Sequence, residues 1–186
     1  MAAQTQARWI SNARPARRRQ SANSNSPGND WTDKYPAIAK AIAGLPARNA
    51  YLDGELCGVL PDGRTAFNLI QNATDTGEGS LVFFLFYLLH LDGENLTALP
   101  LVDRKTRLAS QLHDAPNSLR YNDHQIGHGP AFHRLACERG LEGIVSKRTN
   151  GPYAPDRRSG SRSSASTGRS LSSSDGVIPK AATWRC

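Results

Sequence analysis

The sequence predicts an α+β domain flanked by two disordered end segments. Three observations support this prediction. Helical and strand patterns alternate irregularly between residues 30 and 153, which favours α+β over the α/β alternative. With 38% apolar and 21% charged residues among 186, the chain can build a core. The net charge of +7 is uneven, since residues 1–30 carry +4, residues 31–153 carry −1 and residues 154–186 carry +4.

The two ends have the composition of solvated chain. Residues 1–28 are rich in Arg, Ser and Asn, and nine of the 16 residues from Ser159 to Ser174 are serine. Low hydrophobicity with excess charge does not offset the entropy lost on ordering. We therefore expect a disordered segment over 1–28, a folded part over 29–156 and a disordered tail over 157–186.

Hydrophobic spacing places helices and strands within the folded part. Thr32 is expected to cap a helix with Tyr35, Ile38 and Ile42 at helical spacing, before Pro46 stops it. Residues 61–64 carry a turn signal. Further helices are expected over 66–73, 100–112 and 130–139, and strands over 50–59, 81–89, 119–121 and 143–147.

Several function classes are excluded by simple counts. The longest apolar run, residues 81–89, has nine residues, whereas a membrane-spanning helix needs about 20. The three cysteines, Cys57, Cys137 and Cys186, form no C-x-x-C pair, which argues against a disulfide framework or a zinc site. We expect a reducing cytoplasm and no membrane partner.

Two short strands carry a carboxylate beside a glycine. Glu55 follows Gly54, and Glu142 precedes Gly143. A buried glutamate needs a partner or a metal ion, and a neighbouring glycine lets a ligand approach the backbone. Taken singly, each piece fits a turn or a surface charge as well. Lys147 lies five residues after Glu142, an odd offset that places the two on opposite faces of a regular strand.

The order and spacing of several segments resemble ATP-dependent DNA ligases, and in particular the ligase domain of the bacterial end-joining ligase D. The resemblance covers about residues 29–156. The segments that carry it are Leu-Asp-Gly-Glu at 52–55, Phe-Tyr-Leu-Leu-His-Leu-Asp-Gly at 86–93, Glu-Gly-Ile-Val-Ser-Lys at 142–147, and the shorter stretches 30–36 and 99–101.

The resemblance implies an incomplete adenylation (nucleotidyltransferase) domain with antiparallel sheets around an ATP cleft. Enzymes of this family attach AMP to a lysine, pass it to a DNA 5′-phosphate and seal the nick, with Mg²⁺ neutralising developing charge. By the match, Glu55 would contact the ribose or the metal side and Phe86 would stack on adenine. Glu142 would help hold Mg²⁺, and Lys147 would support the phosphates.

The sequence departs from the family in the residues that react. The family's nucleophile is the lysine of K-x-D-G, and no K-x-D-G occurs in the sequence. Tyr51 precedes Leu-Asp-Gly, but a phenol is a poor substitute, and Tyr87 replaces a usual acid. The W-x-K-x-K motif and the OB-fold domain that would close over the nick are also missing. We therefore predict no catalytic lysine and no lysyl adenylate.

A change of reading frame is our hypothesis for the lost motifs. Residues 158–165 can be back-translated into a coding sequence whose alternative frame, read two bases in, gives Glu-Trp-Ile-Lys-Val-Lys-Cys. This string contains the missing W-x-K-x-K. Residues 1–28 are expected to be out of frame in a similar way, so that the chain is a truncated, frameshifted ligase.

The first hypothesis for function is accordingly a fragment of an ATP-dependent ligase of DNA repair and recombination, inactive alone. Its implied partners are nicked or broken double-stranded DNA and end-joining proteins, and its place is the bacterial cytoplasm at the nucleoid. The alternative is a non-catalytic nucleic-acid-binding protein that uses its Arg-rich ends to neutralise phosphates. A nucleotidyltransferase of the RNA-capping type is a third hypothesis, and it fits the motif context less well.

Overall fold

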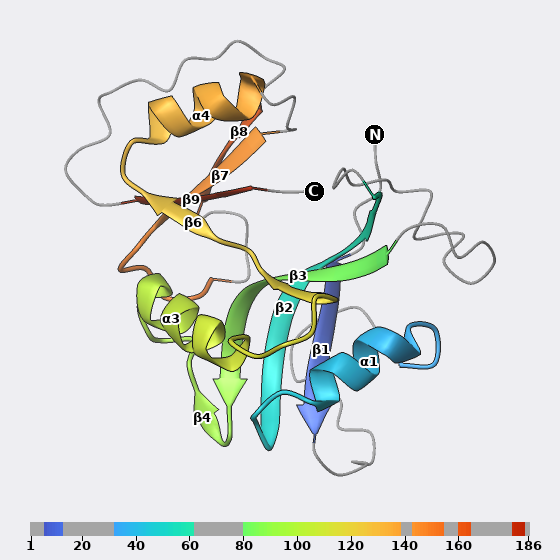
Figure 1. Cartoon of the computed structure of the whole chain (residues 1–186). Helices are drawn as coiled ribbons and strands as arrows, with labels where there is room; N and C mark the ends of the chain where they lie inside the picture. Colours follow the sequence, from blue (N-terminus) through green and yellow to red (C-terminus); the bar gives the residue numbers. More distant parts are fainter. Residues whose placement is uncertain are drawn as a thin grey trace. The chain divides into compact units, whose positions relative to one another are not determined.

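The computed structural model of the chain describes residues 6–12, 32–61, 80–138, 143–154, 160–164 and 180–184. It divides into two compact units (Figure 1). The first consists of Met1–Leu96 and Arg107–Tyr121, and the second of Thr97–Thr106 and Asn122–Cys186. Each unit contains a sheet, and helix α3 (Leu101–Gln111) begins in the second unit and ends in the first.

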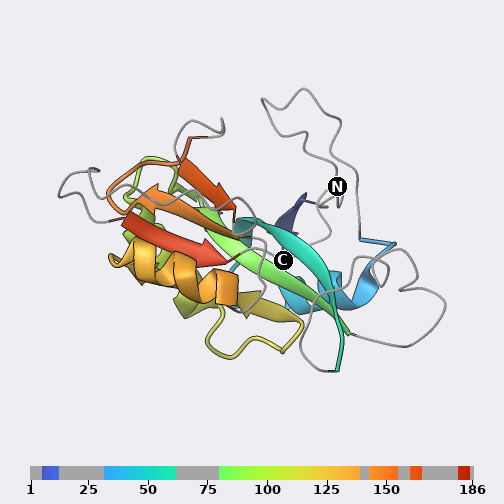
Figure 2. The same cartoon turned by 90° about the horizontal axis from the view of Figure 1, so that it is seen from above.

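The first unit is built on a five-stranded sheet. Its strands are β1 (Gln6–Asn12), β2 (Asn49–Val59), β3 (Ser80–Leu91), β4 (Glu94–Asn95) and β5 (Leu119–Tyr121). They follow the order β1-β2-β3-β4, all antiparallel, and β5 pairs with β3 in parallel. Figure 2 shows β2 and β3 side by side along their length. Strand β1 is therefore an edge strand of this sheet, and β2 is an inner strand.

The core of the first unit is built around β2 and β3. Leu52, Leu56, Phe83, Leu85 and Leu88 are all essentially inaccessible to solvent. Burial in β2 alternates only as far as Asp53, and every residue from Gly54 to Val59 is buried, so both faces of this half of the strand are covered. Helix α1 (Pro36–Ala43) adds its own buried residues, Ile38 and Ile42, to the core.

Helix α1 is shorter than the sequence predicts. Tyr35, and not Thr32, occupies the N-cap position, where it makes no capping hydrogen bond through its side chain. Pro36 begins the helix because its fixed φ suits the first helical turn, where its missing N–H costs nothing. The expected end is confirmed, since the Gly44 N–H donates to the carbonyls of Lys40 and Ala41 at 3.1 and 3.2 Å.

A tight turn at Asp92 joins β3 to β4 and also holds the start of β2. Asp92 and Gly93 both have positive φ, at 48° and 99°, as a tight hairpin turn requires. The Asp92 carboxylate accepts hydrogen bonds from the backbone N–H groups of Arg48 at 2.7 Å and Asn49 at 2.9 Å. The Leu-Asp-Gly stretch at residues 91–93 therefore has a structural role of its own.

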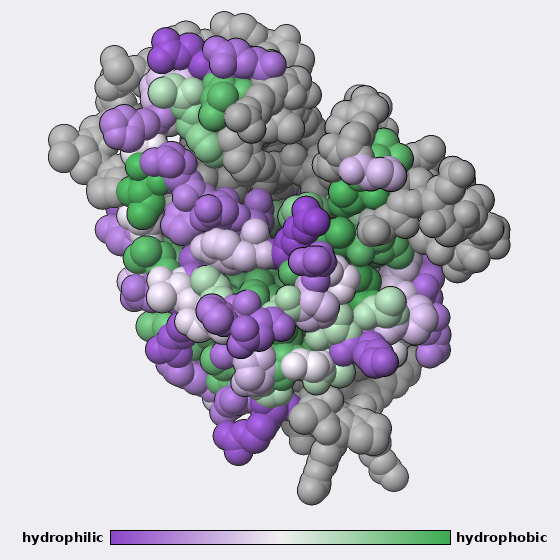
Figure 3. Space-filling view, in the orientation of Figure 1, coloured by the Kyte–Doolittle hydropathy of each residue, from purple (hydrophilic) through white to green (hydrophobic). Residues whose placement is uncertain are grey.

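The second unit contains a four-stranded antiparallel sheet in the order β6-β9-β7-β8. Its strands are β6 (His124–Ile126), β7 (Gly143–Arg148), β8 (Gly160–Ser164) and β9 (Lys180–Trp184). Helix α4 (Gly129–Glu138) contacts β6, β7 and β9. It buries Ala136 fully, while the hydrophilic residues in Figure 3 mark its outer side. Ile144 on β7 is buried as well.

Most of the elements expected from the sequence are confirmed within the described residues. Strands β2, β3, β5 and β7 and helices α3 and α4 agree with the expected segments to within three residues at each end. The expected helix over 66–73 lies outside the described residues. No helix among the described residues is long and apolar enough to cross a membrane.

The two ends differ from the predicted disorder at three places. Strand β1 lies within 1–28, and strands β8 and β9 lie within 157–186. Composition decides whether a segment can build a core, but pairing within a sheet uses backbone N–H and C=O groups that every non-proline residue has. The remaining residues of both ends lie outside the described part.

Candidate functional site

Glu55 is the buried carboxylate of the first unit. It lies on β2 directly opposite Phe84 of β3, and its side chain is only 3% exposed. The neighbouring Gly54 is required by close packing, because a Cβ there would collide with the carbonyl oxygen of Phe84 and lie 3.0 Å from the Phe83 ring. The Asp-Gly-Glu sequence therefore brings a charged group into a site where the backbones approach closely.

Phe86 occupies an irregular point of β3 beside Glu55. Asp53 pairs with Tyr87 and Gly54 pairs with Leu85, so Phe86 is the extra residue of a β-bulge. A bulge bends the strand and redirects a side chain, and bulges are frequent next to active sites. The half-buried Phe86 ring contacts the Tyr87 ring edge-on, with centroids 6.4 Å apart and planes at 63°. The structure thus brings Glu55 and Phe86 to adjacent strands of one unit.

The other two predicted site residues belong to the second unit. Lys147 is half-buried on β7, where its backbone pairs with Gly160 of β8 and Ala181 of β9. Glu142 lies outside the described residues, and so its predicted role as a Mg²⁺ ligand stays a prediction. Among the described residues, no group of three or more His, Cys, Asp or Glu side chains could hold a metal ion.

A buried lysine that the sequence analysis missed lies in the second unit. Lys105 on α3 is 1% exposed, and its Nζ donates a 2.7 Å hydrogen bond to the carbonyl of Asn122. Burial lowers the pKa of Lys105 to about 8; Asp123 opposes this shift, while the charges of Lys147 and Arg104 add to it. The signal was present in the sequence, because Lys105 shares a helical face with Leu101 and Leu108.

Arg104 fixes the start of α3 to the segment that follows β7. Its Nε donates to the carbonyl of Leu99 at 3.1 Å and its Nη2 to that of Gly151 at 3.3 Å. Its guanidinium lies 5.8 Å from the ring centroid of Tyr153, a cation–π arrangement. The backbone N–H of Val102 also donates to Thr149 at 3.1 Å. Arg104 therefore acts as a structural clamp within the second unit.

His124 borders the same group of charges. Burial lowers the pKa of His124, the Lys105 charge lowers it further, and Asp123 partly opposes both effects. Lys105, Lys147 and Arg104 thus interact as a cationic group opposed by Asp123, and His124 is held towards its neutral form. Such clusters of perturbed groups are commoner at functional sites than elsewhere.

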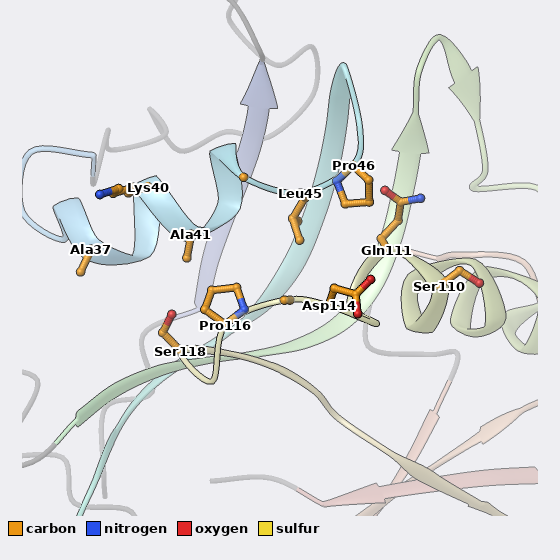
Figure 4. A pocket seen from close by; sticks show the side chains of 12 residues that line it. Ala37, Lys40, Ala41, Leu45, Pro46, Ser110, Gln111, Asp114, Pro116 and Ser118 are labelled. Carbon is orange, nitrogen blue, oxygen red and sulfur yellow. The ribbon is translucent and has the colours of Figure 1, made fainter.

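A cavity of about 520 Å³ lies in the first unit, between α1 and the end of α3 (Figure 4). Ala37, Ala41 and Leu45 line one side, and Asp114 and Pro116 line the other. Figure 4 shows Ala37 and Ala41 facing the Pro116 loop. None of the residues predicted to bind ATP lines this cavity. Its position therefore does not coincide with the strand pair that carries Glu55 and Phe86.

Comparison with known proteins identifies the family. The family model of the ATP dependent DNA ligase domain matches residues 20–162. The multifunctional non-homologous end joining protein LigD of Pseudomonas aeruginosa is 35% identical over 132 residues, which cover 70% of this chain and 16% of that protein. The SPbeta prophage-derived DNA ligase-like protein LigB of Bacillus subtilis is 33% identical over 133 residues, covering 70% of this chain and 48% of that one.

Solved structures agree with this assignment. The ligase domain of M. tuberculosis LigD matches with a TM-score of 0.60 and 29% identity, over 74% of this chain and 45% of that one. A mycobacterial DNA ligase D complexed with ATP and MES matches with a TM-score of 0.59 and 30% identity, over the same shares. The chain therefore spans less than half the length of these relatives. It belongs to the ATP-dependent DNA ligase family.

Proposed function

We propose that this chain is the core of a ligase adenylation domain that binds ATP without forming a lysyl adenylate. The observation that carries the proposal is the β2–β3 pair, in which the buried Glu55 lies beside the bulge at Phe86. This pair lies within the region that matches the ATP-dependent ligase domain. A related mycobacterial ligase was solved in complex with ATP, which supports a nucleotide as the ligand.

Each proposed site residue contributes chemistry suited to a nucleotide. The half-buried Phe86 ring offers a face for stacking on adenine. The Glu55 carboxylate accepts hydrogen bonds from ribose hydroxyls or faces a metal ion. Lys147 adds positive charge on the phosphate side, and Glu142 supplies an oxygen ligand of the kind that Mg²⁺ prefers. When bound, Mg²⁺ neutralises phosphate charge.

The missing lysine determines what the chain does with ATP. Without K-x-D-G the 186 residues contain no amine in the family's nucleophilic position, so AMP is not transferred to the chain. In a complete ligase the next partners would be nicked or broken double-stranded DNA and, by the end-joining relatives, proteins of DNA repair and recombination. We assign the chain to the same process, in the bacterial cytoplasm at the nucleoid, as a non-catalytic member.

Calorimetric titration with ATP and Mg²⁺ tests the binding. The chain should bind ATP, and Glu55→Gln should weaken binding by about tenfold, because a hydrogen bond to a charged group contributes about 1.5–3 kcal/mol. Lys40→Gln removes a charge on the exposed side of α1, at the cavity away from the site, and should leave ATP binding unchanged. A folded chain that takes up no ATP would refute the proposal.

The alternative, nucleic-acid binding through the Arg-rich ends, makes a different prediction. Arg17, Arg18 and Arg19 form a run in the N-terminal segment. Replacing all three with Gln should weaken DNA binding and reduce its dependence on salt if phosphate neutralisation is the main function. A gel shift that responds to this change, in a chain that binds no ATP, would favour the alternative.

A further inference from the structure

Strand β1 brings an N-terminal segment against the strand that carries the proposed ATP site. In the antiparallel register, Gln6 pairs with Glu55 and Arg8 pairs with Asp53. Directly opposed residues of antiparallel strands have Cβ atoms about 5 Å apart. Position 6 is therefore the cross-strand register partner of Glu55.

The same segment can be back-translated so that another frame gives a different peptide. Residues 6–11 are Gln-Ala-Arg-Trp-Ile-Ser. One coding sequence for these residues is CAA GCT CGA TGG ATA TCG, followed by the A that begins either Asn codon, and read one base later it gives Lys-Leu-Asp-Gly-Tyr-Arg. The glycine is compulsory, because the Trp codon TGG followed by the A of any Ile codon always yields GGA. This peptide contains the K-x-D-G that is absent from the chain.

We infer that position 6 is the place of the lost nucleophilic lysine, and that residues 6–11 are the out-of-frame product of a Lys-Leu-Asp-Gly-Tyr-Arg segment. The inference rests on the proposed function and deepens it, because it assigns the missing reactive group to one position beside Glu55. The inference names the position at which the lysine belonged, in addition to its absence from the sequence. The backbone of position 6 is paired with that of the site strand in this structure.

A second segment shows the same relation. Residues 158–165, for which a back-translation exists whose alternative frame contains Trp-Ile-Lys-Val-Lys, include strand β8. Strand β8 pairs with β7, so that Gly160 lies opposite Lys147, another proposed site residue. Each of the two re-read segments therefore includes a strand that pairs with a strand carrying a proposed site residue.

The chemistry explains why glutamine at position 6 silences the site. The amide nitrogen of Gln6 shares its lone pair with the carbonyl and is no nucleophile. A neutral lysine amine at this position would attack the α-phosphorus of ATP. The P–N bond would form, the bond from the α-phosphorus to the oxygen bridging to the β-phosphate would break, pyrophosphate would leave, and the amine proton would pass to water.

The coding DNA tests the inference without any folded protein. The third base of the Gln6 codon and the third base of the Arg8 codon must both be A, because only then does the shifted frame give Lys and Asp around the compulsory Gly. If the Gln6 codon is CAG, the shifted codon is AGG, an arginine, and the inference fails. If the Arg8 codon ends in any other base, the aspartate is lost and the inference also fails.

A gain-of-function variant tests the same position in the protein. The full chain with Gln6→Lys, Arg8→Asp and Trp9→Gly is incubated with Mg²⁺ and ATP labelled on its α-phosphate. We expect an acid-labile AMP adduct, located at position 6 by mass spectrometry, whereas the unmodified chain stays at background. The matched control carries Gln6→Arg with the same two companion changes, and it should remain unlabelled.

The outcomes separate this inference from the proposed function. If neither chain binds ATP in a titration, the proposed function fails. If the triple variant binds ATP as the unmodified chain does but acquires no AMP, or acquires it at another lysine, position 6 is not the nucleophile's place. Comparing ATP binding of the two chains also shows whether the variant has kept its fold.

Discussion

The strands that carry the proposed site differ from the strands that flank them. Strands β2 and β7 lie inside their sheets and keep side chains suited to a nucleotide, Glu55 and Lys147 among them. Strands β1 and β8 lie at the edges of the described sheets, and their backbones pair with those of β2 and β7. The difference teaches that backbone pairing tolerates nearly any sequence, whereas phosphoryl transfer depends on single side chains.

The largest expected effect tests the inner strand. Gly54→Val on β2 should lower the free energy of unfolding by about 3 kcal/mol, because its Cβ would collide with the Phe84 carbonyl and the Phe83 ring. Its register partner on the edge strand, Ala7, provides the control. Ala7→Val should change stability by less than about 0.5 kcal/mol. Equal losses in urea unfolding would remove the distinction between inner and edge strands.

The pH dependence of stability tests Lys105, the buried lysine of α3. Because the pKa of Lys105 is about 8 in the folded chain, against an ordinary value of 10.5 for an exposed lysine, the unfolded chain binds more protons between these values. The free energy of unfolding should therefore gain a rising contribution from pH 8 to pH 10.5, by a few kcal/mol.

Lys105→Met provides the comparison for this effect. Below pH 8 both states of the parent chain carry the charged amine, so the cost of burying it is fully present there. The variant should lack the rise that Lys105 adds, while other groups continue to titrate in both proteins. Parallel pH profiles of parent and variant, measured by urea unfolding at several pH values, would show that Lys105 titrates normally.

A smaller effect is expected when the Phe86 ring on β3, which we propose to stack on adenine, is removed. Phe86→Ala should weaken ATP binding by roughly tenfold, because stacking of a base on an aromatic ring contributes about 1–3 kcal/mol. Tyr51→Ala removes a half-buried aromatic ring from the far part of the neighbouring β2 and should leave the ATP affinity unchanged. Competition with a fluorescent ATP analogue measures both. If Tyr51→Ala costs as much as Phe86→Ala, the bulge has no special role.

The smallest expected effect concerns the turn that holds the start of β2. Asp92→Ala should lower stability by about 1 kcal/mol, because the N–H groups of Arg48 and Asn49 lose their acceptor and turn to water. Asp92→Asn keeps an acceptor oxygen and tolerates the positive φ of this position, so it should lose less. Thermal unfolding distinguishes the two variants, and the reverse order would contradict the assignment.

Much of the inner architecture follows from the sequence, for physical reasons. The stretch from Ala50 to Val59 predicts β2, and the apolar run from Leu81 to Leu89 predicts β3. The bulge at Phe86 could not be predicted, since a uniformly apolar run contains no signal for register. Lys105 was missed because charged residues are normally assigned to a solvated helix face, although its spacing from Leu101 and Leu108 indicated the core. Strands β1, β8 and β9 escape prediction because composition does not report backbone pairing.

The candidate site, like the fold, could be predicted only in part from the sequence. Glu55 and Phe86 were predicted from motif order, and the structure places them on adjacent strands of one unit. The pairing of position 6 with Glu55 could come only from the register of β1. Motifs indicate which side chains are needed, and register indicates where a missing one belongs.

Incubation of the unmodified chain with Mg²⁺ and ATP labelled on its α-phosphate tests the central claim most directly. The chain should retain labelled ATP in equilibrium dialysis and lose all label on denaturation, because it holds the nucleotide without a nucleophile. A label that survives denaturation under neutral conditions and maps to a lysine of this chain would contradict the account.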